Sequence, residues 1–432
     1  MNTTKCPGTL LKETTMPFNW HPDEPPPSIE SHTLAKLAVL RSYLRAYIDR
    51  LNVNPSREEF KLDLIDGFAG GGMYLDGKAE VSGSPLVMLE ETEKARIRLN
   101  ERRVKQLHID CKFYFVDKEQ AHTDYLREVL KVRGHHINDD RIVIRNGQFE
   151  NEIEGILASV QDRQPRSGRS IFLLDQKGFS RVQLSLVARI FRKFPAAEVI
   201  LTFAADALVN NLSETQRTLK AVAPIQLTVS QISDLIQQRD ANFGRALMQR
   251  TLRDHVRHLT GATFDTPFFI RPRQSRRALW FLHLSKHPTA RDVMIQLHWE
   301  LQNTFEHYGS GEFGMLGWDA LKDSKTLPLL KFSELDAQQM QKELLESLPR
   351  KLFKLVSEHP VALDTLRHLF ANQTAARFSD LDQVILQLVQ EREFEILNQE
   401  GKVRSRRIKR LARTDLVTLP TTLLLPGLSR LS

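Results

Sequence analysis

Short segments that are almost entirely apolar alternate with longer amphipathic segments through the middle of the chain. The apolar segments are residues 62–68, 111–117, 141–146, 170–175 and 198–204. A strand covered on both faces is apolar throughout, and strands that alternate with helical segments are typical of a parallel sheet between helices. Two further β-type segments, 266–272 and 278–285, are joined by a short Arg-rich connection. We therefore predict an α/β fold with a mostly parallel sheet and an antiparallel hairpin at its edge.

The same pattern divides the chain into four parts. They are a Pro-rich arm (1–31), an α/β domain that begins with an amphipathic helix over 32–53 (32–300), a connecting segment (301–330) and a helical end (331–432). A segment as polar and proline-rich as the arm buries too little to fold alone. Within the α/β domain, a polar helical insertion at about 207–262 is longer than a plain crossover needs.

The helical end has a pattern of its own. Three helical segments, 335–357, 361–371 and 379–391, precede a hairpin that turns near Asn398–Gly401. Helices followed by such a hairpin predict a winged-helix-like domain. The densest basic run of the chain lies at this hairpin and contains Lys402, Arg404, Arg406, Arg407, Lys409 and Arg410. We predict that it binds nucleic-acid phosphates, and the alternative is a solvated face that balances nearby acids.

Composition excludes several classes of protein. The 432 residues are 41% hydrophobic and 26% charged, which describes an ordinary soluble chain long enough for more than one domain. No apolar run approaches the roughly 20 residues of a membrane-spanning helix, and the N-terminus lacks a secretory pattern, so we expect a cytoplasmic protein. Cys6 and Cys111 support neither a disulfide framework nor a metal site. The net charge of +8 is compatible with a nucleic-acid partner without requiring one.

Acids and glycines mark the ends of the first two predicted strands. The first strand ends in Asp66 and runs into the loop Gly67–Gly72, where glycines let the backbone turn tightly and approach a ligand. The second strand ends in Asp117, whose carboxylate can accept hydrogen bonds from the two hydroxyls of a ribose. Asp66 and Asp117 are much further apart in the sequence than the glycine-rich turn and the acid of a dinucleotide-binding fold, whose spacing is about 20 residues. We therefore expect an extra loop at about 73–83.

The third and fourth predicted strands also end in candidate ligand-binding residues. Gln148 and Phe149 follow the third strand, and an amide and an aromatic ring suit an adenine. Asp175 follows the fourth strand, with Lys177 and Phe179 close behind. Because ligands of open parallel sheets bind beyond the carboxyl ends of the strands, we expect these residues to converge with the two earlier acids. The alternative for Asp175 is a cap of the helix that follows.

The order of these motifs resembles that of a known family. The segments are YLRAYI, LIDGFAGGG, GSPLVML, FVDKE, NGQFE, FLLDQKGFS and LSKHPTARDVM. They resemble the bacterial three-Cys-motif partner family, whose members are similar to class I S-adenosylmethionine-dependent methyltransferases. The resemblance implies a Rossmann-like class I methyltransferase fold, S-adenosylmethionine as cofactor, and a small partner protein with three cysteines. The residues it implies for the cofactor are Asp66, Phe68, Ala69, Gly70, Gly72, Asp117, Gln148 and Phe149.

Two departures from the family pattern leave the activity open. Gln148 stands where relatives have an acid, and Gln176 and Lys177 replace the proline and first aromatic residue of Asp-Pro-Phe-Gly-Tyr-Ser. In amino-methyltransferases a similar loop holds an exocyclic amine and stacks on a flipped base. One interpretation is a methyltransferase that acts on a nucleic-acid base amine, with Asp175 catalytic and with Lys177 and Phe179 on the substrate. The alternative is a catalytically degenerate module that recruits nucleic acid or a partner protein in bacterial defence or repair.

Overall fold

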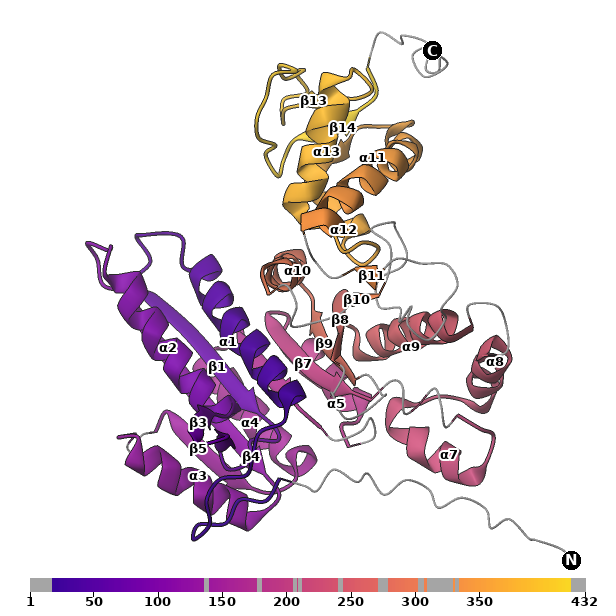
Figure 1. The fold of residues 1–432 in the computed structure, drawn as a ribbon. Coiled ribbons are helices and arrows are strands. Elements are labelled where there is room, and N and C mark those ends of the chain that lie inside the picture. The colour runs from indigo at the N-terminus through magenta and orange to yellow at the C-terminus, as the bar shows by residue number, and fades with distance from the viewer. Residues whose placement is uncertain are drawn as a thin grey trace, which may run out of the picture.

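A seven-stranded sheet forms the centre of the chain in the computed structural model (Figure 1). Its strands are β1 (Glu59–Asp66), β4 (His108–Asp117), β5 (Ile142–Asn146), β6 (Ser170–Leu174), β7 (Ala197–Phe203), β8 (Phe264–Ile270) and β9 (Leu279–Ser285). Their order is β5-β4-β1-β6-β7-β9-β8, and β9 alone runs in the direction opposite to the other six strands. The predicted Rossmann-like, methyltransferase-like fold with an antiparallel edge hairpin is confirmed. The structure describes residues 18–135, 140–176, 181–204, 208, 212–239, 244–270, 279–301, 307–308, 329–330 and 334–420.

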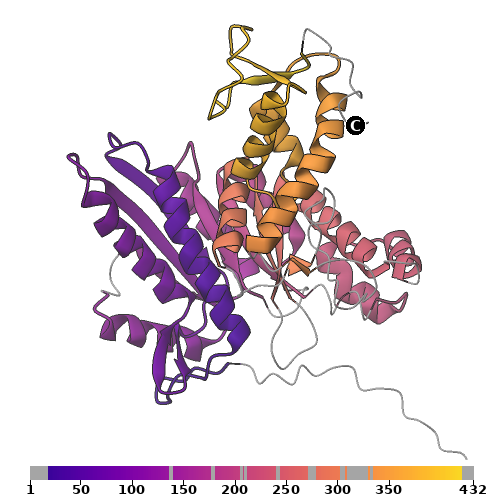
Figure 2. The same cartoon turned by 45° about the horizontal axis from the view of Figure 1, so that its top comes forward.

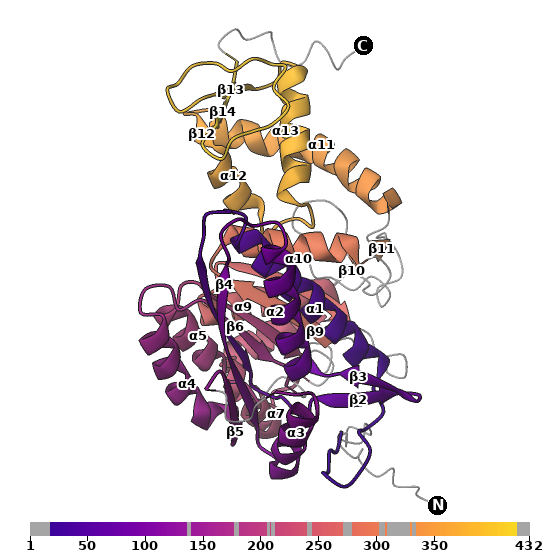
Figure 3. The same ribbon diagram turned by 90° about the vertical axis from the view of Figure 1, so that its left-hand side faces the viewer.

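Hydrophobic cores lie on the two faces of this sheet. One core is covered by α1 (Ser31–Leu51), α2 (Ser84–Asn100), α3 (Gln120–Val132) and α10 (Pro288–Glu300), the other by α4 (Phe149–Arg163), α5 (Leu184–Lys193) and α9 (Gly244–Thr260). Successive side chains of a strand point to opposite faces, so in β1 Leu64 joins the first core and Ile65 the second. Figure 3 shows α4 and α5 on one side of the sheet and α1 on the other. None of the helices in the described ranges is both long and apolar enough to cross a membrane.

The segment between β1 and α2 is a β-hairpin rather than the loop expected at 73–83. Strands β2 (Met73–Asp76) and β3 (Ala79–Ser82) pair antiparallel. Their turn begins with Gly77, whose φ of 63° lies in the left-handed region that glycine adopts without strain. A glycine at the first of the two loop positions, here Gly77 and Lys78, is a sequence signal for such a turn. The hairpin projects beside the N-terminal segment and carries Tyr74 toward the functional site described below.

The insertion predicted at about 207–262 is helical where the structure describes it. It contains α7 (Gln216–Val222), the 3-10 turn η1 (Ala223–Ile225), α8 (Val229–Arg239) and α9. Helix α9 packs on α5, whereas Figure 1 shows α7 and α8 standing beyond the sheet.

Residues 334–420 form a unit of helices and short strands. Its elements in chain order are α11 (Glu334–Val356), β12 (Val361–Ala362), α12 (Leu363–Phe370), α13 (Phe378–Gln390), β13 (Glu395–Leu397) and β14 (Leu416–Thr418). The strands pair antiparallel in the order β12-β14-β13, and Figure 2 shows them at the outer end of the unit. The expected turn is present, because the Asn398 side chain accepts hydrogen bonds from the backbone of Glu400 and Lys402. Of the predicted connecting segment, the structure describes Leu301 and the paired β10 (His307–Tyr308) and β11 (Leu329–Leu330).

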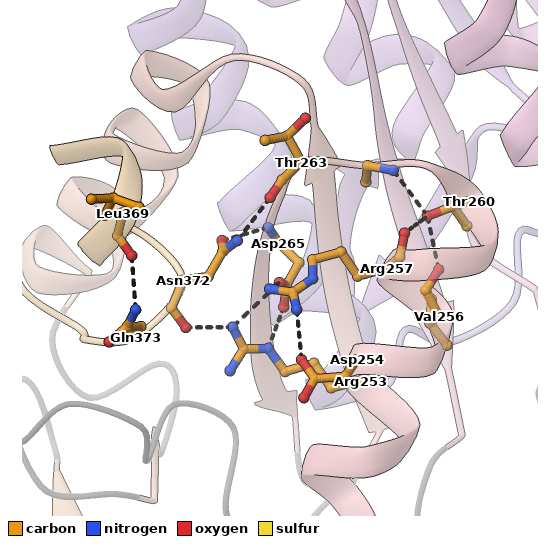
Figure 4. Close-up of polar contacts among 11 residues, drawn as sticks. Arg253, Asp254, Val256, Arg257, Thr260, Thr263, Asp265, Leu369, Asn372 and Gln373 are labelled. Atoms are coloured by element: carbon orange, nitrogen blue, oxygen red, sulfur yellow. Dashed lines mark hydrogen bonds and ion pairs between the residues drawn. The ribbon is translucent and has the colours of Figure 1, made fainter. Parts of the chain in front are cut away.

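A polar joint holds this unit at the edge of the sheet where the parallel strands begin (Figure 4). Asn372 donates to the Thr263 carbonyl at 2.7 Å, and its side chain accepts from the Asp265 N–H at 3.2 Å. Arg253 of α9 forms a buried ion pair with Asp265 and donates to the Asn372 carbonyl at 2.8 Å. The start of β8 pairs with the end of β9, which lies beside the start of β7. The unit therefore docks at the amino-terminal edge of the parallel strands.

Candidate functional site

Three carboxylates meet at the opposite edge of the sheet, where its parallel strands end. Asp66 ends β1, Asp117 ends the neighbouring β4, and Asp175 follows β6 on the other side of β1. The chain changes direction across the sheet at β1, and ligands of open α/β sheets bind at such a switch point. Burial, and then the charges of all three carboxylates, raise the pKa of Tyr74 in the hairpin. The structure thus brings the three acids together as the strand order predicts.

Asp66 is a buried acid with an incomplete set of partners. Its side chain is 0% exposed, and Oδ1 accepts from the Phe68 N–H at 3.1 Å. The Ser84 hydroxyl is close enough to act on the carboxylate, but Oδ2 has no donor in hydrogen-bond geometry among the described residues. Burial raises the pKa of Asp66 to about 7, and the charges of the other two acids add to the rise. A buried acceptor of this kind fits a ligand that brings a cation or an N–H donor.

The glycine loop connects the ends of three strands. Gly67 and Ala69 donate backbone hydrogen bonds to carbonyl groups of β6 and β4. Gly70 and Gly72 have φ values of 59° and 77°, which side-chain-bearing residues rarely adopt. The Gly70 N–H donates to Oδ2 of Asp117 at 2.9 Å. The predicted loop and the predicted acid are therefore in direct contact.

Asp117 is held ready as a charged acceptor. Its Oδ1 accepts from the Glu119 N–H at 2.9 Å and lies 3.1 Å from Nδ1 of His122. Burial opposes ionisation, but the hydrogen bonds from His122 and the backbone outweigh burial and lower the pKa of Asp117. An ionised carboxylate at this position suits the two hydroxyls of a ribose. The sequence analysis did not single out His122, although its place in the first turn after the acid is a usable signal.

Gln148 and Phe149 lie in different environments. Gln148 is exposed and precedes the first turn of α4. Phe149 is only 2% exposed and packs against Gly67 and Phe68 in the second core. Contrary to the prediction, Phe149 does not flank an open ligand site, because the first residue of α4 points into the space between helix and sheet. Gln148 remains available to a ligand at this edge.

Asp175 is already bound by two side chains. Nζ of Lys36, on α1, lies 2.7 Å and 2.5 Å from its two oxygens, and the Thr202 hydroxyl donates to Oδ1 at 2.6 Å. Helix α5 begins at Leu184 with Gln183 as its N-cap, so the alternative that Asp175 caps this helix is wrong. A substrate amine at Asp175 has to share the carboxylate with Lys36. The sequence gives no local signal for this pair, because 139 positions separate its members.

Gln176, which directly follows Asp175, is a buried residue whose side chain is bonded to the backbone. Gln176 is 2% exposed, and its Oε1 accepts from the backbone N–H groups of Arg181 and Val182 at 2.9 Å and 2.8 Å. Its Nε2 has no partner among the described residues. The predicted substrate residues Lys177 and Phe179 lie outside the described residues.

The end of the predicted arm is packed onto the site rather than solvated. Trp20 is 4% exposed, and its Nε1 donates to the Met73 carbonyl at 2.6 Å. A Cβ on Gly71 would stand 2.3 Å from the indole, so the ring lies directly on the glycine loop. The ring also meets the His122 imidazole edge-on, at 4.9 Å between centroids. Trp20 of the predicted arm is therefore buried against the site, while the other residues of 18–30 are exposed or half-buried.

The basic segment lies away from the carboxylates. Figures 1 and 3 place the loop between β13 and β14 at the end of the molecule opposite the β2–β3 hairpin. Some of its predicted phosphate ligands are ion-paired within the unit, namely Lys402 with Glu400, Arg404 with Asp415 and Arg406 with Glu395. The others are exposed and have no ion-pair partner in the described part of the chain: Arg407, Lys409 and Arg410. These three residues are the ones free to meet a polyanion.

Comparison with known proteins gives no family for the chain. No protein-family model matches it, and no curated protein matches it. Among solved structures, protein LPL1258 of Legionella pneumophila is 8% identical with a TM-score of 0.31, over 60% of this chain and 89% of that one. WbdD is 13% identical with a TM-score of 0.30, over 58% of this chain and 40% of that one. A putative O-methyltransferase from Klebsiella pneumoniae is 14% identical with a TM-score of 0.28, over 57% and 80%.

Proposed function

We propose that the α/β domain binds S-adenosylmethionine at the carboxyl edge of its sheet and directs the methyl group to a base amine of a nucleic acid. The observation that carries the proposal is the buried oxygen of Asp66 that has no hydrogen-bond partner among the described residues, beside Asp117, whose pKa is lowered. Asp117 would hold the ribose hydroxyls, Asp66 would accept from the amino group of the methionine portion, and Gln148 would meet the adenine. When bound, the cofactor supplies a methyl group on a sulfonium.

The remaining task of the chain is to align the acceptor and exclude water. Lys36 and Thr202 fix the orientation of the Asp175 carboxylate, which would receive the N–H of the acceptor amine. The helical unit, which we propose to be winged-helix-like, would bind the nucleic acid through its exposed basic loop. A small three-Cys partner protein in the bacterial cytoplasm completes the proposal.

Calorimetric titration with S-adenosylmethionine and S-adenosylhomocysteine tests the cofactor site. We expect Asp117→Ala to weaken binding at least about 100-fold, because two hydrogen bonds to a charged group contribute about 3 kcal/mol or more. Glu119→Ala is the matched control, since its side chain is exposed and the backbone N–H that holds Asp117 remains. Equal loss of affinity in both variants, or no binding by the unmodified chain, by Trp20→Ala and by Ile29→Pro, would reject the proposal.

A second candidate is a binding module without methyl transfer. The ion pair between Lys36 and Asp175 favours it, because a carboxylate already bound by a lysine is a poor acceptor for a substrate amine. Labelled methyl groups distinguish the candidates. Incorporation into nucleic acid supports the enzyme, whereas ligand and nucleic-acid binding without incorporation supports the module.

Nucleic-acid binding is expected to depend on the exposed basic residues of the loop. Changing Arg407, Lys409 and Arg410 to glutamine should flatten the dependence of log K on log salt for duplex DNA by about 2.7, since each phosphate contact contributes about 0.9. The control changes three exposed basic residues of the α/β domain that pair with acids: Arg96, Lys105 and Lys118. An equal change of slope in both variants would show that the attraction is not localised at the loop.

A further inference from the structure

The segment that precedes α1 extends the β2–β3 hairpin. The Ile29 N–H donates to the Leu75 carbonyl at 2.7 Å, and the Leu75 N–H donates to the Pro27 carbonyl at 3.0 Å. Ser28 forms a parallel bridge with Leu75 between these two bonds. Residues 27–29 therefore run alongside the hairpin and hold the preceding residues over the carboxyl edge of the sheet.

At that edge the segment covers the glycine loop with an aromatic ring. A Cβ added to Gly70 would lie 2.8 Å from the Trp20 indole, and a Cβ added to Gly71 would lie 2.3 Å from it. The same indole packs edge-on against Tyr74 and against His122, with centroids 5.2 Å and 4.9 Å apart. His122 in turn contacts the carboxylate of Asp117, the acid proposed to bind the ribose hydroxyls. The indole thus occupies the approach to both the glycine loop and the residue that orients this acid.

We propose that residues 18–30 form a lid over the cofactor site, and that Trp20 must leave the glycine loop before an adenosyl ligand can bind. The inference rests on the proposed function. A glycine loop serves a ligand because its backbone can be approached without an intervening Cβ, and here the indole fills that space. The lid ends at Glu30, where α1 begins without a side-chain cap.

The rest of the site stays in place when the lid opens. Leu37, Leu40 and Leu44 of α1 are buried in the core, so Lys36 remains on Asp175 while the preceding segment moves. The lid is attached to the hairpin through the indole N–H and the backbone bonds of Leu75. Such a set of contacts can be removed without disturbing the sheet.

Two variants of the full chain test the lid by different routes. Trp20→Ala removes the covering ring, and Ile29→Pro removes the N–H that attaches the segment to Leu75. We expect both to bind S-adenosylhomocysteine at least about tenfold more tightly in calorimetry, because the apparent affinity rises with the fraction of open molecules. Glu24→Ala, an exposed change within the same segment, is the control and should bind like the unmodified chain.

Tryptophan fluorescence provides a readout that is independent of affinity. Addition of S-adenosylhomocysteine should shift the emission of the unmodified chain to longer wavelength as Trp20 moves into water, and Trp20→Phe should lose this shift. Equal affinity in all variants overturns the lid and leaves the cofactor site standing. Weaker binding by Trp20→Ala and Ile29→Pro, with native thermal unfolding, makes Trp20 a wall of the site and also overturns the lid. Absence of binding in every variant overturns the proposed function together with the lid.

Discussion

Asp66→Asn is expected to stabilise the ligand-free protein progressively as the pH rises from 4 to 8. Burial raises the pKa of Asp66 to about 7 from an ordinary value of 3.8. Between these two values the unfolded chain has lost a proton that the folded chain keeps, so the folded state loses stability as the pH increases. A difference of about 3 pKa units corresponds to about 4 kcal/mol. The free energy of unfolding of Asp66→Asn, minus that of the unmodified chain, should therefore grow by about 4 kcal/mol between pH 4 and pH 8.

Urea denaturation across this pH range measures the effect. Asp76→Asn, an exposed change at the end of β2, is the matched control. A flat difference for Asp66→Asn would show that Asp66 is ionised in the folded protein and has partners there. The same variant should lose affinity for the adenosyl ligand, because asparagine cannot supply a negative charge to an amino group. A residue that destabilises the fold and yet is needed for binding is typical of a functional site.

The sheet and its helices are predictable because their signals are local. Strands such as β6 and β7 are buried along their whole length, and this gives uninterrupted apolar segments between amphipathic ones. The glycine loop and the acids at the strand ends follow from the same reasoning, since the parallel strands bring their carboxyl ends to one edge. The β2–β3 hairpin was not predicted, although Gly77 at the first position of its turn is a usable sequence signal.

The partners of the site residues are not predictable in the same way. Lys36 reaches Asp175 only because α1 packs across the sheet, and Trp20 reaches Gly71 only because residues 27–29 pair with the hairpin. Neither contact can be predicted from the hydrophobic periodicity of the sequence or from the spacing of its motifs. Phe149 is buried because it is the first residue of α4. The start of a helix varies by one or two residues, so the sequence does not fix which residue takes this position. The ends of the strands are therefore predictable from the sequence, whereas these long-range contacts are not.

In the proposed function, the two ends of the sheet would have separate tasks. The acids lie where the parallel strands end, whereas the helical unit docks where they begin, at Thr263 and Asp265. A strand of seven residues such as β7 spans roughly 23 Å at about 3.3 Å per residue. A nucleic acid bound to the loop of Arg407 must therefore extend past the sheet to present a base to Asp175. The rigidity of the joint then decides how well the two sites are aligned.

Asp265→Asn is expected to destabilise the protein by about 3–5 kcal/mol and to loosen the helical unit. Asp265 is 1% exposed and Arg253 is 5% exposed, so the change leaves the guanidinium charge buried without its carboxylate. Removing one partner of a buried ion pair has this cost because water cannot replace the lost carboxylate at a buried site. Arg253 also donates to the Asn372 carbonyl, which places the unbalanced charge directly in the joint.

Arg257→Ala is the matched control for the joint. Arg257 lies 3.6 Å from the same carboxylate but is 29% exposed, so its loss should cost about 1 kcal/mol or less. Thermal unfolding gives the stability of both variants, and limited trypsin digestion reports on the joint, since only Asp265→Asn should release a fragment that contains residues 334–420. If both variants unfold alike and resist cleavage alike, the ion pair does not hold the unit. If Asp265→Asn alone releases the fragment while S-adenosylhomocysteine still binds, the two edges of the sheet act as independent sites and the ion pair of Arg253 with Asp265 is needed to hold the unit.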